Sequence, residues 1–350
     1  MSQTCSVNIG GITIGDNFPT VVMAEVGTFF NSDITEAERY LRAIANAGAK
    51  LFKTEILHNP NVCLKNTSLT TTYKHTEGST TEDYRALIER KVVPLEDYAK
   101  LFTLCRDLGI PFVCSIYDVE GVDFIVEQGG AAIKFARDNM DNIALIRYAA
   151  ATGLPLIMDA GNLYLSEIAR AIETARKFGD GGVILNHHPA ANPAPPEIHN
   201  LRVIETYKRT FGVPVGLSCH YRGDEILYAA VGAGVNLIEK GVDFNPDRTE
   251  QDLVSAAPMN SLSDIIRKVN NCWMALGKIR WEVSEPRNQS SWKGFVARSN
   301  IQKGTPLNLN NVGFSFPCKG ISVANWDLIV GHHAARDICE GEVINWQDVV

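Results

Sequence analysis

The sequence has no excess of positive charge and no long uninterrupted run of apolar residues. Its 350 residues include 33 Lys and Arg against 40 Asp and Glu, a formal net charge of −7. This balance argues against nucleic acid or an anionic membrane surface as the main partner. No apolar run approaches the roughly 18 residues that a membrane-spanning helix requires. We therefore expect no nucleic-acid or membrane partner, although converging cations in a pocket would still accommodate a small anion.

Three sequence motifs are also absent. The eight cysteines include no C-x-x-C pair, which argues against a disulfide framework and indicates a reducing compartment. The first residues, MSQTCSVNIGGITIGDNF, have neither the basic region nor the apolar core of a signal peptide. No G-x-G-x-x-G opens the first helical segment, so we expect no nucleotide cofactor. Together these absences predict a cytoplasmic protein.

Short β-rich runs alternate with longer helical patterns between about residues 20 and 275. Eight strands are predicted, over residues 20–26, 50–56, 111–117, 131–136, 155–161, 182–188, 214–219 and 236–241. Each is followed by a helical segment, as successive parallel strands require. This pattern predicts a (β/α)8 barrel, a TIM barrel, over residues 1–277. The run VNIGGITIG before the first strand predicts a hairpin that caps the barrel floor.

Three stretches depart from this alternation of strands and helices. Residues 58–93 form a long Thr-, Ser- and Asn-rich connection with one short helical run, which we interpret either as an active-site lid or as a flexible insertion. Residues 278–293 are polar and are predicted to be a linker. Residues 294–350 read as short strands and turns and predict a separate small β-rich domain.

Polar residues gather at the carboxyl ends of the predicted strands, where barrels of this kind carry their chemistry. They are Glu25, Lys53, Glu55, Ser115, Lys134, Arg137, Asp159, Asn186, His187, His188, Ser218, His220, Glu239 and Lys240. Charges inside apolar strands are costly unless they converge on something. The lysines with Arg137 and the serines suggest a cradle for a phosphate or a carboxylate. The alternative is a set of internal salt bridges, such as Lys53 with Glu25.

The segments VVMAEVGTFFNSD, KLFKTEI, GIPFVCSIYD, AAIKFA, GLPLIMDAG and VPVGLSCH resemble, in order and spacing, the barrel of the sialic acid synthase family. The tail, GFVARSNIQKGTPLNLNNV to the end, resembles that family's C-terminal antifreeze-like (SAF) domain. The resemblance covers essentially the whole chain. It implies condensation of phosphoenolpyruvate with an aldose such as an N-acylated mannosamine, with release of phosphate and formation of a nonulosonic acid.

The resemblance also implies roles for individual residues. Lys53, Ser115, Lys134 and Ser218 match positions that hold phosphoenolpyruvate. Arg137 replaces a family serine but would still favour an anion, and we add Asn186 to the anion-binding residues from its place at a strand end. Catalysis would fall to Glu25, beside the reacting carbon and its water, with His220 and Glu239. In the family Glu239 matches a glutamate that contacts the sugar. From their places at the strand ends, we expect Glu55, Asp159, His187 and Lys240 to contact the acceptor as well. The family's divalent metal, Mn²⁺ or Mg²⁺, would bind His220 and a second histidine.

Several positions depart from the family pattern. The second metal histidine is Gly241, and Phe29 and Phe30 replace Asn and His after the first strand. Phe316 stands where the family has an arginine that reaches the acylamino sugar in the partner's barrel. Because the anion-holding positions are kept and the others change, we expect an acceptor other than N-acetylmannosamine. His220 would bind metal only if Asp243, Asp159 or His187 or His188 replaced the lost ligand. Otherwise it would face the acceptor's carbonyl oxygen as a hydrogen-bond donor or an acid–base group.

Two other functions stay open from the sequence. One is a metal-independent aldolase with a Schiff-base lysine, Lys134 or Lys240. The other is a non-catalytic binder of an anionic sugar. The family also implies a homodimer in which the small domain covers the partner subunit's barrel.

Overall fold

The computed structural model describes residues 5–278 and 291–350, which divide into two compact units, Met1–Gly277 and Lys278–Val350. The predicted linker, residues 278–293, lies largely outside the described residues. Among the described residues no helix is long and apolar enough to cross a membrane.

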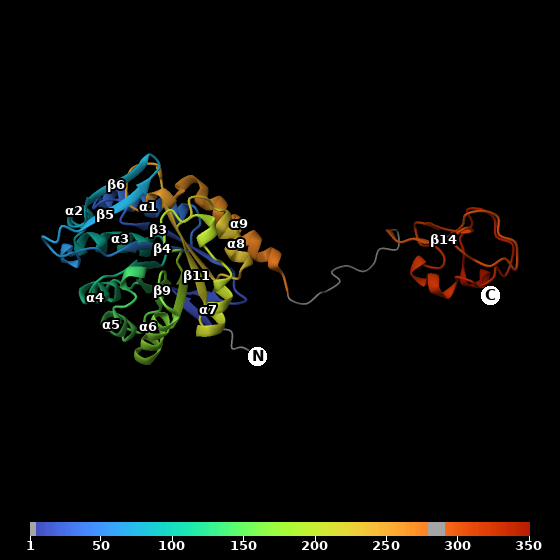
Figure 1. Cartoon of the computed structure of the whole chain (residues 1–350), viewed down its shortest axis with the longest axis horizontal. Helices are drawn as coiled ribbons and strands as arrows, with labels where there is room; N and C mark the ends of the chain where they lie inside the picture. The colour runs from blue at the N-terminus through green and yellow to red at the C-terminus, as the bar shows by residue number, and fades with distance from the viewer. Residues whose placement is uncertain (1–4, 279–290) are drawn as a thin grey trace. The chain divides into compact units, whose positions relative to one another are not determined.

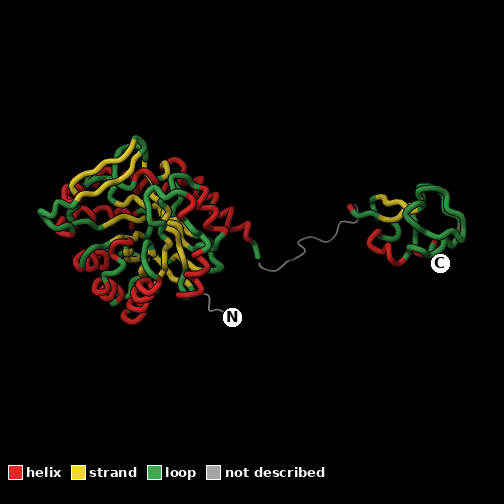
Figure 2. The backbone as a smooth tube through the Cα atoms, in the orientation of Figure 1, coloured by secondary structure: helices red, strands yellow, loops and turns green. Residues whose placement is uncertain are grey.

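The first unit is a closed parallel barrel with helices on its outside (Figures 1 and 2). Pairing of β12 with both β11 and β3 closes the ring. The barrel strands are β3 (Val21–Gly27), β4 (Leu51–Glu55), β7 (Phe112–Ser115), β8 (Ala132–Phe135), β9 (Leu156–Ala160), β10 (Val183–His187), β11 (Val215–Cys219) and β12 (Leu237–Asp243). Each predicted strand coincides with one of these to within two residues at either end. The predicted (β/α)8 fold is confirmed.

Helices follow the strands in the expected alternation. They are α1 (Ile34–Asn46), α2 (Tyr84–Lys91), α3 (Leu95–Asp107), α4 (Val119–Glu127), α5 (Ile143–Ala150), α6 (Leu165–Phe178), α7 (Val203–Phe211), α8 (Glu225–Gly232) and α9 (Leu262–Leu276). Helix α1 shows why these segments are helical. The Asp33 side chain caps its first turn by accepting from two backbone N–H groups, and its buried residues, Ala37, Tyr40, Leu41 and Ile44, recur at helical spacing.

A hairpin closes the floor of the barrel, as predicted. Its strands are β1 (Ser6–Ile9) and β2 (Ile12–Gly15), paired antiparallel. Val7, Ile9 and Ile14 of this hairpin pack with the first inward-facing residues of the barrel strands in one buried cluster. The turn residue Gly10 has a φ of +56°, and a Cβ there would lie 2.4 Å from Pro111, so only glycine fits.

The long connection after β4 holds more structure than predicted. Strands β5 (Thr70–His75) and β6 (Gly78–Asp83) form an antiparallel hairpin, and helix α2 follows it. We expected the helical run but not the hairpin. In Figure 1 the hairpin stands at one end of the barrel strands.

The second unit has its own apolar core and a small antiparallel sheet, β14 (Gly294–Ala297) with β15 (Val312–Ser315). The core contains Phe295, Ala297, Ile301, Leu307, Val312, Ile321, Ile329, Ala334, Ile338 and Ile344. In the first unit a short strand, β13 (Ala257–Pro258), lies beside the end of β12 and pairs with it in parallel.

Candidate active site

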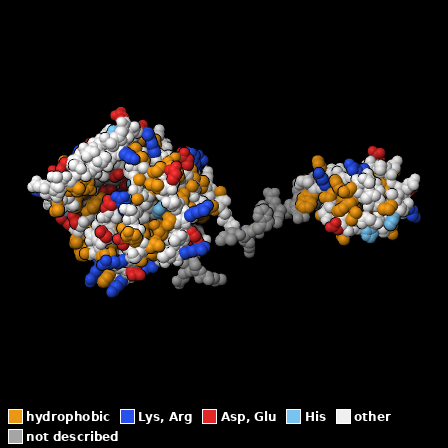
Figure 3. Space-filling model, in the orientation of Figure 1, with side chains coloured by type: hydrophobic (Ala, Val, Ile, Leu, Met, Phe, Trp, Pro, Cys, Tyr) orange, Lys and Arg blue, Asp and Glu red, His pale blue; other side chains and the backbone are white. Residues whose placement is uncertain are grey.

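A cavity of about 620 Å³ opens at the carboxyl ends of the barrel strands. Predicted site residues at the ends of six strands line it, together with the β5–β6 hairpin. They are Glu25, Lys53, Glu55, Lys134, Arg137, Asp159, His220, Glu239 and Gly241. The space-filling view is hollowed beside the ridge that this hairpin forms, and acidic side chains are visible there (Figure 3).

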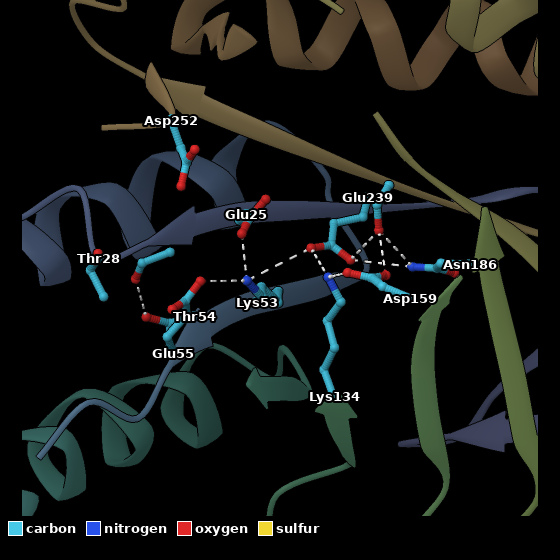
Figure 4. Close-up of polar contacts among 12 residues, drawn as sticks. Glu25, Thr28, Lys53, Thr54, Glu55, Lys134, Asp159, Asn186, Glu239 and Asp252 are labelled. Atoms are coloured by element: carbon cyan, nitrogen blue, oxygen red, sulfur yellow. Dashed lines mark hydrogen bonds and ion pairs between the residues drawn. The ribbon is translucent and has the colours of Figure 1, made fainter. Parts of the chain in front are cut away.

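Lys134 is a buried cation of the cavity. Its Nζ lies 2.6 Å from Glu239 Oε1 and 2.8 Å from Asp159 Oδ2, and all three side chains are buried. Burial opposes the charge of this lysine, but the two carboxylates outweigh that effect and raise its pKa. Lys134 is therefore a charged ammonium held between two carboxylates (Figure 4).

Lys53 lies beside Lys134 and shares a partner with it. Its Nζ forms an ion pair with Glu25, lies 3.2 Å from Glu55 Oε1 and lies 3.7 Å from Glu239 Oε1. The salt bridge of Lys53 with Glu25, which the sequence left open, is thus present. In the described structure both lysines are paired with carboxylates, so an incoming anion must take over some of these contacts.

The carboxylates of this group have very different pKa values. Burial raises the pKa of Glu25 to about 7, although Lys53 acts in the opposite direction. Burial acts the same way on Glu239, but the ammonium groups of Lys134 and Lys53 outweigh it and lower its pKa to about 2. Glu25 can therefore exchange a proton at neutral pH, whereas Glu239 remains a carboxylate.

Ser218 and Asn186 complete the buried network beneath the cavity. Ser218 Oγ donates to Asp159 Oδ1 at 2.7 Å, and Asn186 Nδ2 donates to Ser218 Oγ at 3.1 Å. Asn186 Oδ1 and Ser115 Oγ are buried with no hydrogen-bond partner in the described part of the chain. Neither Asn186 nor Ser115 is among the residues that line the cavity.

Two imidazoles face the cavity from neighbouring strand ends. The rings of His188 and His220 lie with centroids 4.5 Å apart, and the Nδ1 atom of each is buried without a partner. Burial is the main reason that the pKa of each falls to about 3, and the Lys134 ammonium adds to it. Both rings are therefore neutral at physiological pH.

Three predicted residues lie away from the cavity. His187 Nε2 lies 2.6 Å from the carbonyl of His199, and its ring packs beside Tyr207 of α7. Lys240 is buried and donates to the carbonyls of Tyr221, Gly223 and Ser255. Alternation along a strand explains both placements, because their neighbours Asn186 and Glu239 face the barrel interior. The structure therefore does not bring His187 or Lys240 to an acceptor.

Asp243, the third of these residues, is occupied by other partners. Its Oδ2 accepts from Tyr40 and from Arg248 Nη2 at 2.9 Å, and its Oδ1 accepts from the backbone of Asn245 at 2.6 Å. Asp243 thus holds Arg248 rather than facing His220.

The rim of the cavity includes residues that the sequence analysis did not select. Tyr117 donates to Glu55 at 2.5 Å, and Asp252 lines the mouth with a pKa raised by burial. The hairpin contributes Thr71, Thr72, Tyr73 and Lys74. Arg137 is also at the rim, where its Nε lies 2.8 Å from Asp138. The run of β-favouring residues at 70–73, TTTY, was the available strand signal.

The cavity residues do not form a site for the divalent metal that the family resemblance implies. Within residues 5–278 and 291–350 no group of three or more His, Cys, Asp or Glu side chains is arranged to hold a metal ion. His220 lacks a partner at position 241, and Asp159 and Asp243 are committed elsewhere. We therefore derive no reaction step through a metal.

Comparison with known proteins agrees with the barrel and the small domain. Residues 40–280 match the NeuB family, and residues 293–350 match the SAF domain. The chain belongs to the NeuB family. The predicted resemblance is confirmed.

Two relatives and one solved structure illustrate how similar the chain is to known proteins. The chain is 25% identical to N,N'-diacetyllegionaminic acid synthase of Campylobacter jejuni, covering 93% of this chain and 98% of the relative. It is 25% identical to human N-acetylneuraminate-9-phosphate synthase, and the match covers 86% of this chain and 84% of the relative. The structure of N-acetylneuraminic acid synthetase from Leptospira borgpetersenii, in complex with citrate, superposes with a TM-score of 0.71 at 25% identity, covering 81% of this chain and 93% of that one.

Proposed function

We propose that this NeuB-family protein condenses phosphoenolpyruvate with an aldehyde or aldose acceptor, forming a 2-keto-3-deoxy acid and releasing phosphate. The observation that carries this proposal is the pair of buried ammonium groups, Lys53 and Lys134, at the base of a cavity large enough for two small molecules. The family membership supports the same reaction class.

The chain's own residues have clear tasks in such a reaction. The phosphate and carboxylate of phosphoenolpyruvate would exchange places with carboxylates now bound to Lys53 and Lys134. Glu25, whose pKa burial raises to about 7, can carry a proton while the anion binds and so reduce repulsion. It can then give that proton to the acceptor's oxygen and accept one from the water that adds to C2. Glu239 and Asp159 keep Lys134 in place.

The acceptor would occupy the outer part of the cavity. Hydroxyl groups of the β5–β6 hairpin and of Tyr117, with the Asp252 carboxylate, line this part and suit a polyhydroxylated aldehyde. We propose an acceptor other than N-acetylmannosamine, because Phe29 and Gly241 replace two polar family positions.

We also propose a homodimer in which the small domain covers the partner subunit's barrel. Exposed apolar side chains on the small domain support this, since Phe314 is 52%, Phe316 65% and Leu328 58% exposed. Light scattering measures the oligomeric state, and a monomer at working concentration would contradict the proposed homodimer.

The decisive assay is phosphate release from phosphoenolpyruvate across a panel of aldehydes and aldoses. We expect release with at least one acceptor and loss of release in Lys134→Met. Lys50→Met is the matched control, because Lys50 is exposed at the opposite end of the barrel. Binding of phosphoenolpyruvate without release for any acceptor would instead indicate a non-catalytic binder.

A further inference from the structure

The space that a second metal histidine would need is filled by an aromatic ring. A Cβ built on Gly241 lies 3.5 Å from Phe29 Cε2 and 3.6 Å from Phe29 Cζ. A methyl group would fit there in contact with the ring. An imidazole at this position would extend beyond its Cβ and compete with the phenyl group for space.

The position of Phe29 is itself fixed by the residues around it. Arg248 Nη2 donates to the Phe29 carbonyl at 2.7 Å and is held in turn by Asp243 at 2.9 Å. Asp243, which the sequence suggested as a replacement ligand, therefore anchors the arginine that holds Phe29. The Phe29 side chain is 5% exposed.

The remaining candidates leave His220 with one neighbouring imidazole and no third ligand. Asp159 accepts from Lys134 and Ser218. Two histidines are fewer than the three protein ligands that divalent metal sites usually supply. The ammonium groups near both rings also disfavour a dication.

The same two rings are well arranged for another task. They face the cavity together from β10 and β11, with ring centroids 4.5 Å apart and no side-chain hydrogen bond to either ring in the described residues. An imidazole N–H that faces a cavity is an effective hydrogen-bond donor to a carbonyl oxygen. Donors in a cavity that excludes water stabilise developing negative charge strongly.

We propose that His188 and His220 jointly polarise the acceptor's carbonyl by N–H hydrogen bonds, and that this step uses no bound divalent metal. The inference rests on the proposed function. C3 of phosphoenolpyruvate bonds to the carbonyl carbon, and the carbonyl π electrons move to the oxygen that accepts from the two N–H groups. One water then supplies the proton for that oxygen and the hydroxyl group for C2. The bond between C2 and the phosphate oxygen breaks and phosphate leaves with the electron pair, while the C2 hydroxyl group gives its proton to the departing phosphate and becomes the keto group.

Metal binding tests this inference without relying on activity. Mn²⁺ titrated into the full-length protein is followed by electron paramagnetic resonance, for the wild type, Gly241→His and the double variant Phe29→Asn/Gly241→His. We expect no stoichiometric Mn²⁺ in the wild type or the single variant and a gain of at least about 10-fold in affinity in the double variant, where the ring is gone. Stoichiometric Mn²⁺ in the wild type that His220→Ala abolishes would overturn the inference.

Activity measurements test the two rings. We expect phosphate release to survive EDTA, and His188→Ala to lower kcat about 100-fold, the usual loss of one such donor, with the KM for phosphoenolpyruvate unchanged. His187→Ala is the matched control, since its ring faces α7. Full activity in a folded His188→Ala variant, or its loss in EDTA with recovery in Mn²⁺, would contradict the inference. Failure of the proposed function is distinguishable, because it would abolish phosphate release in the wild type while leaving the Mn²⁺ titrations interpretable.

Discussion

Lys134 Nζ lies 2.6 Å from Glu239 Oε1, an ion pair that joins β8 to β12 across the interior of the barrel. Asp159, 2.8 Å from the same nitrogen, ties β9 to the pair. One side chain thus balances two buried carboxylates that come from strands far apart in the sequence. The same nitrogen is the proposed contact for the incoming anion.

Removing this cation should affect both stability and binding. In Lys134→Met the carboxylates of Asp159 and Glu239 stay buried without their main partner, which should cost about 3–5 kcal/mol of unfolding free energy. Urea denaturation measures this loss. Calorimetry on the folded fraction should show no binding of phosphoenolpyruvate. A variant that keeps wild-type stability would show that other groups, such as Lys53, balance the charge.

Phosphoenolpyruvate binding should be linked to a proton on Glu25. Since burial raises the pKa of Glu25 to about 7, the residue is largely protonated below pH 7 and ionised above it. An ionised Glu25 repels the anion, so affinity should fall as the pH rises above 7. Calorimetry in buffers of different ionisation enthalpy should detect proton uptake near pH 7.

Glu55 provides the control for this pH dependence. Burial opposes its ionisation, but Lys53 and Tyr117 lower its pKa below the usual value. Glu25→Gln should therefore abolish the pH dependence above pH 7, and Glu55→Gln should retain it. An unchanged pH profile in Glu25→Gln would place the linked proton elsewhere.

No Schiff base should form on a lysine of this cavity. Carboxylates raise the pKa of Lys134, which keeps it charged and non-nucleophilic. Lys240 is enclosed by three carbonyl oxygens and lies away from the cavity. Borohydride treatment with pyruvate should add no mass to the intact protein. A single adduct mapped to either lysine would revive the metal-independent aldolase.

The β5–β6 hairpin should govern affinity for the acceptor. Arg90 holds it by two contacts to Glu82, at 2.7 and 3.1 Å, and its Nη2 lies 3.6 Å from the buried Glu250. Arg90→Ala should raise the KM for the acceptor several-fold and leave that for phosphoenolpyruvate unchanged. Hydrogen exchange of the hairpin amides should become faster.

A surface arginine is the matched control for this variant. Arg209→Ala removes an exposed pair with Glu205 on α7 and should change neither KM nor hairpin exchange. Equal effects of the two variants would mean that the hairpin is not held by Arg90.

Alternation and turn signals were sufficient to predict the barrel strands. Apolar runs with helical segments between them specify parallel strands, because each crossover needs a helix. The same alternation could have predicted that the Lys240 side chain points away from the cavity, since Glu239 and Lys240 must point to opposite faces of β12. We assigned it to the cavity because a charge in a strand suggested function, and its three carbonyl partners come from loops that the sequence does not place.

The partners of the cavity lysines could not be predicted from the sequence. Lys53 could have been a free cation or a salt-bridge partner of Glu25, because pairing depends on side-chain positions across three strands. The hairpin at 70–83 was missed since its polar strands lack an apolar face, which is the signal that alternation relies on. Its pairing is set by the neighbouring strand and by contacts such as Arg90 with Glu82.

The hairpin at the barrel floor would fix the order in which substrates enter the cavity in the proposed reaction. Val7, Ile9 and Ile14 cover one end, and Lys53 and Lys134 stand one inward-facing position above the apolar layer that these residues complete. Ligands can then reach the lysines only past the mouth lined by the β5–β6 hairpin. A molecule bound on the lysines must enter before one bound at the mouth. Steady-state kinetics should therefore show a compulsory ordered mechanism in which the anion binds first. An acceptor that binds before the anion should block the cavity and act as a dead-end inhibitor.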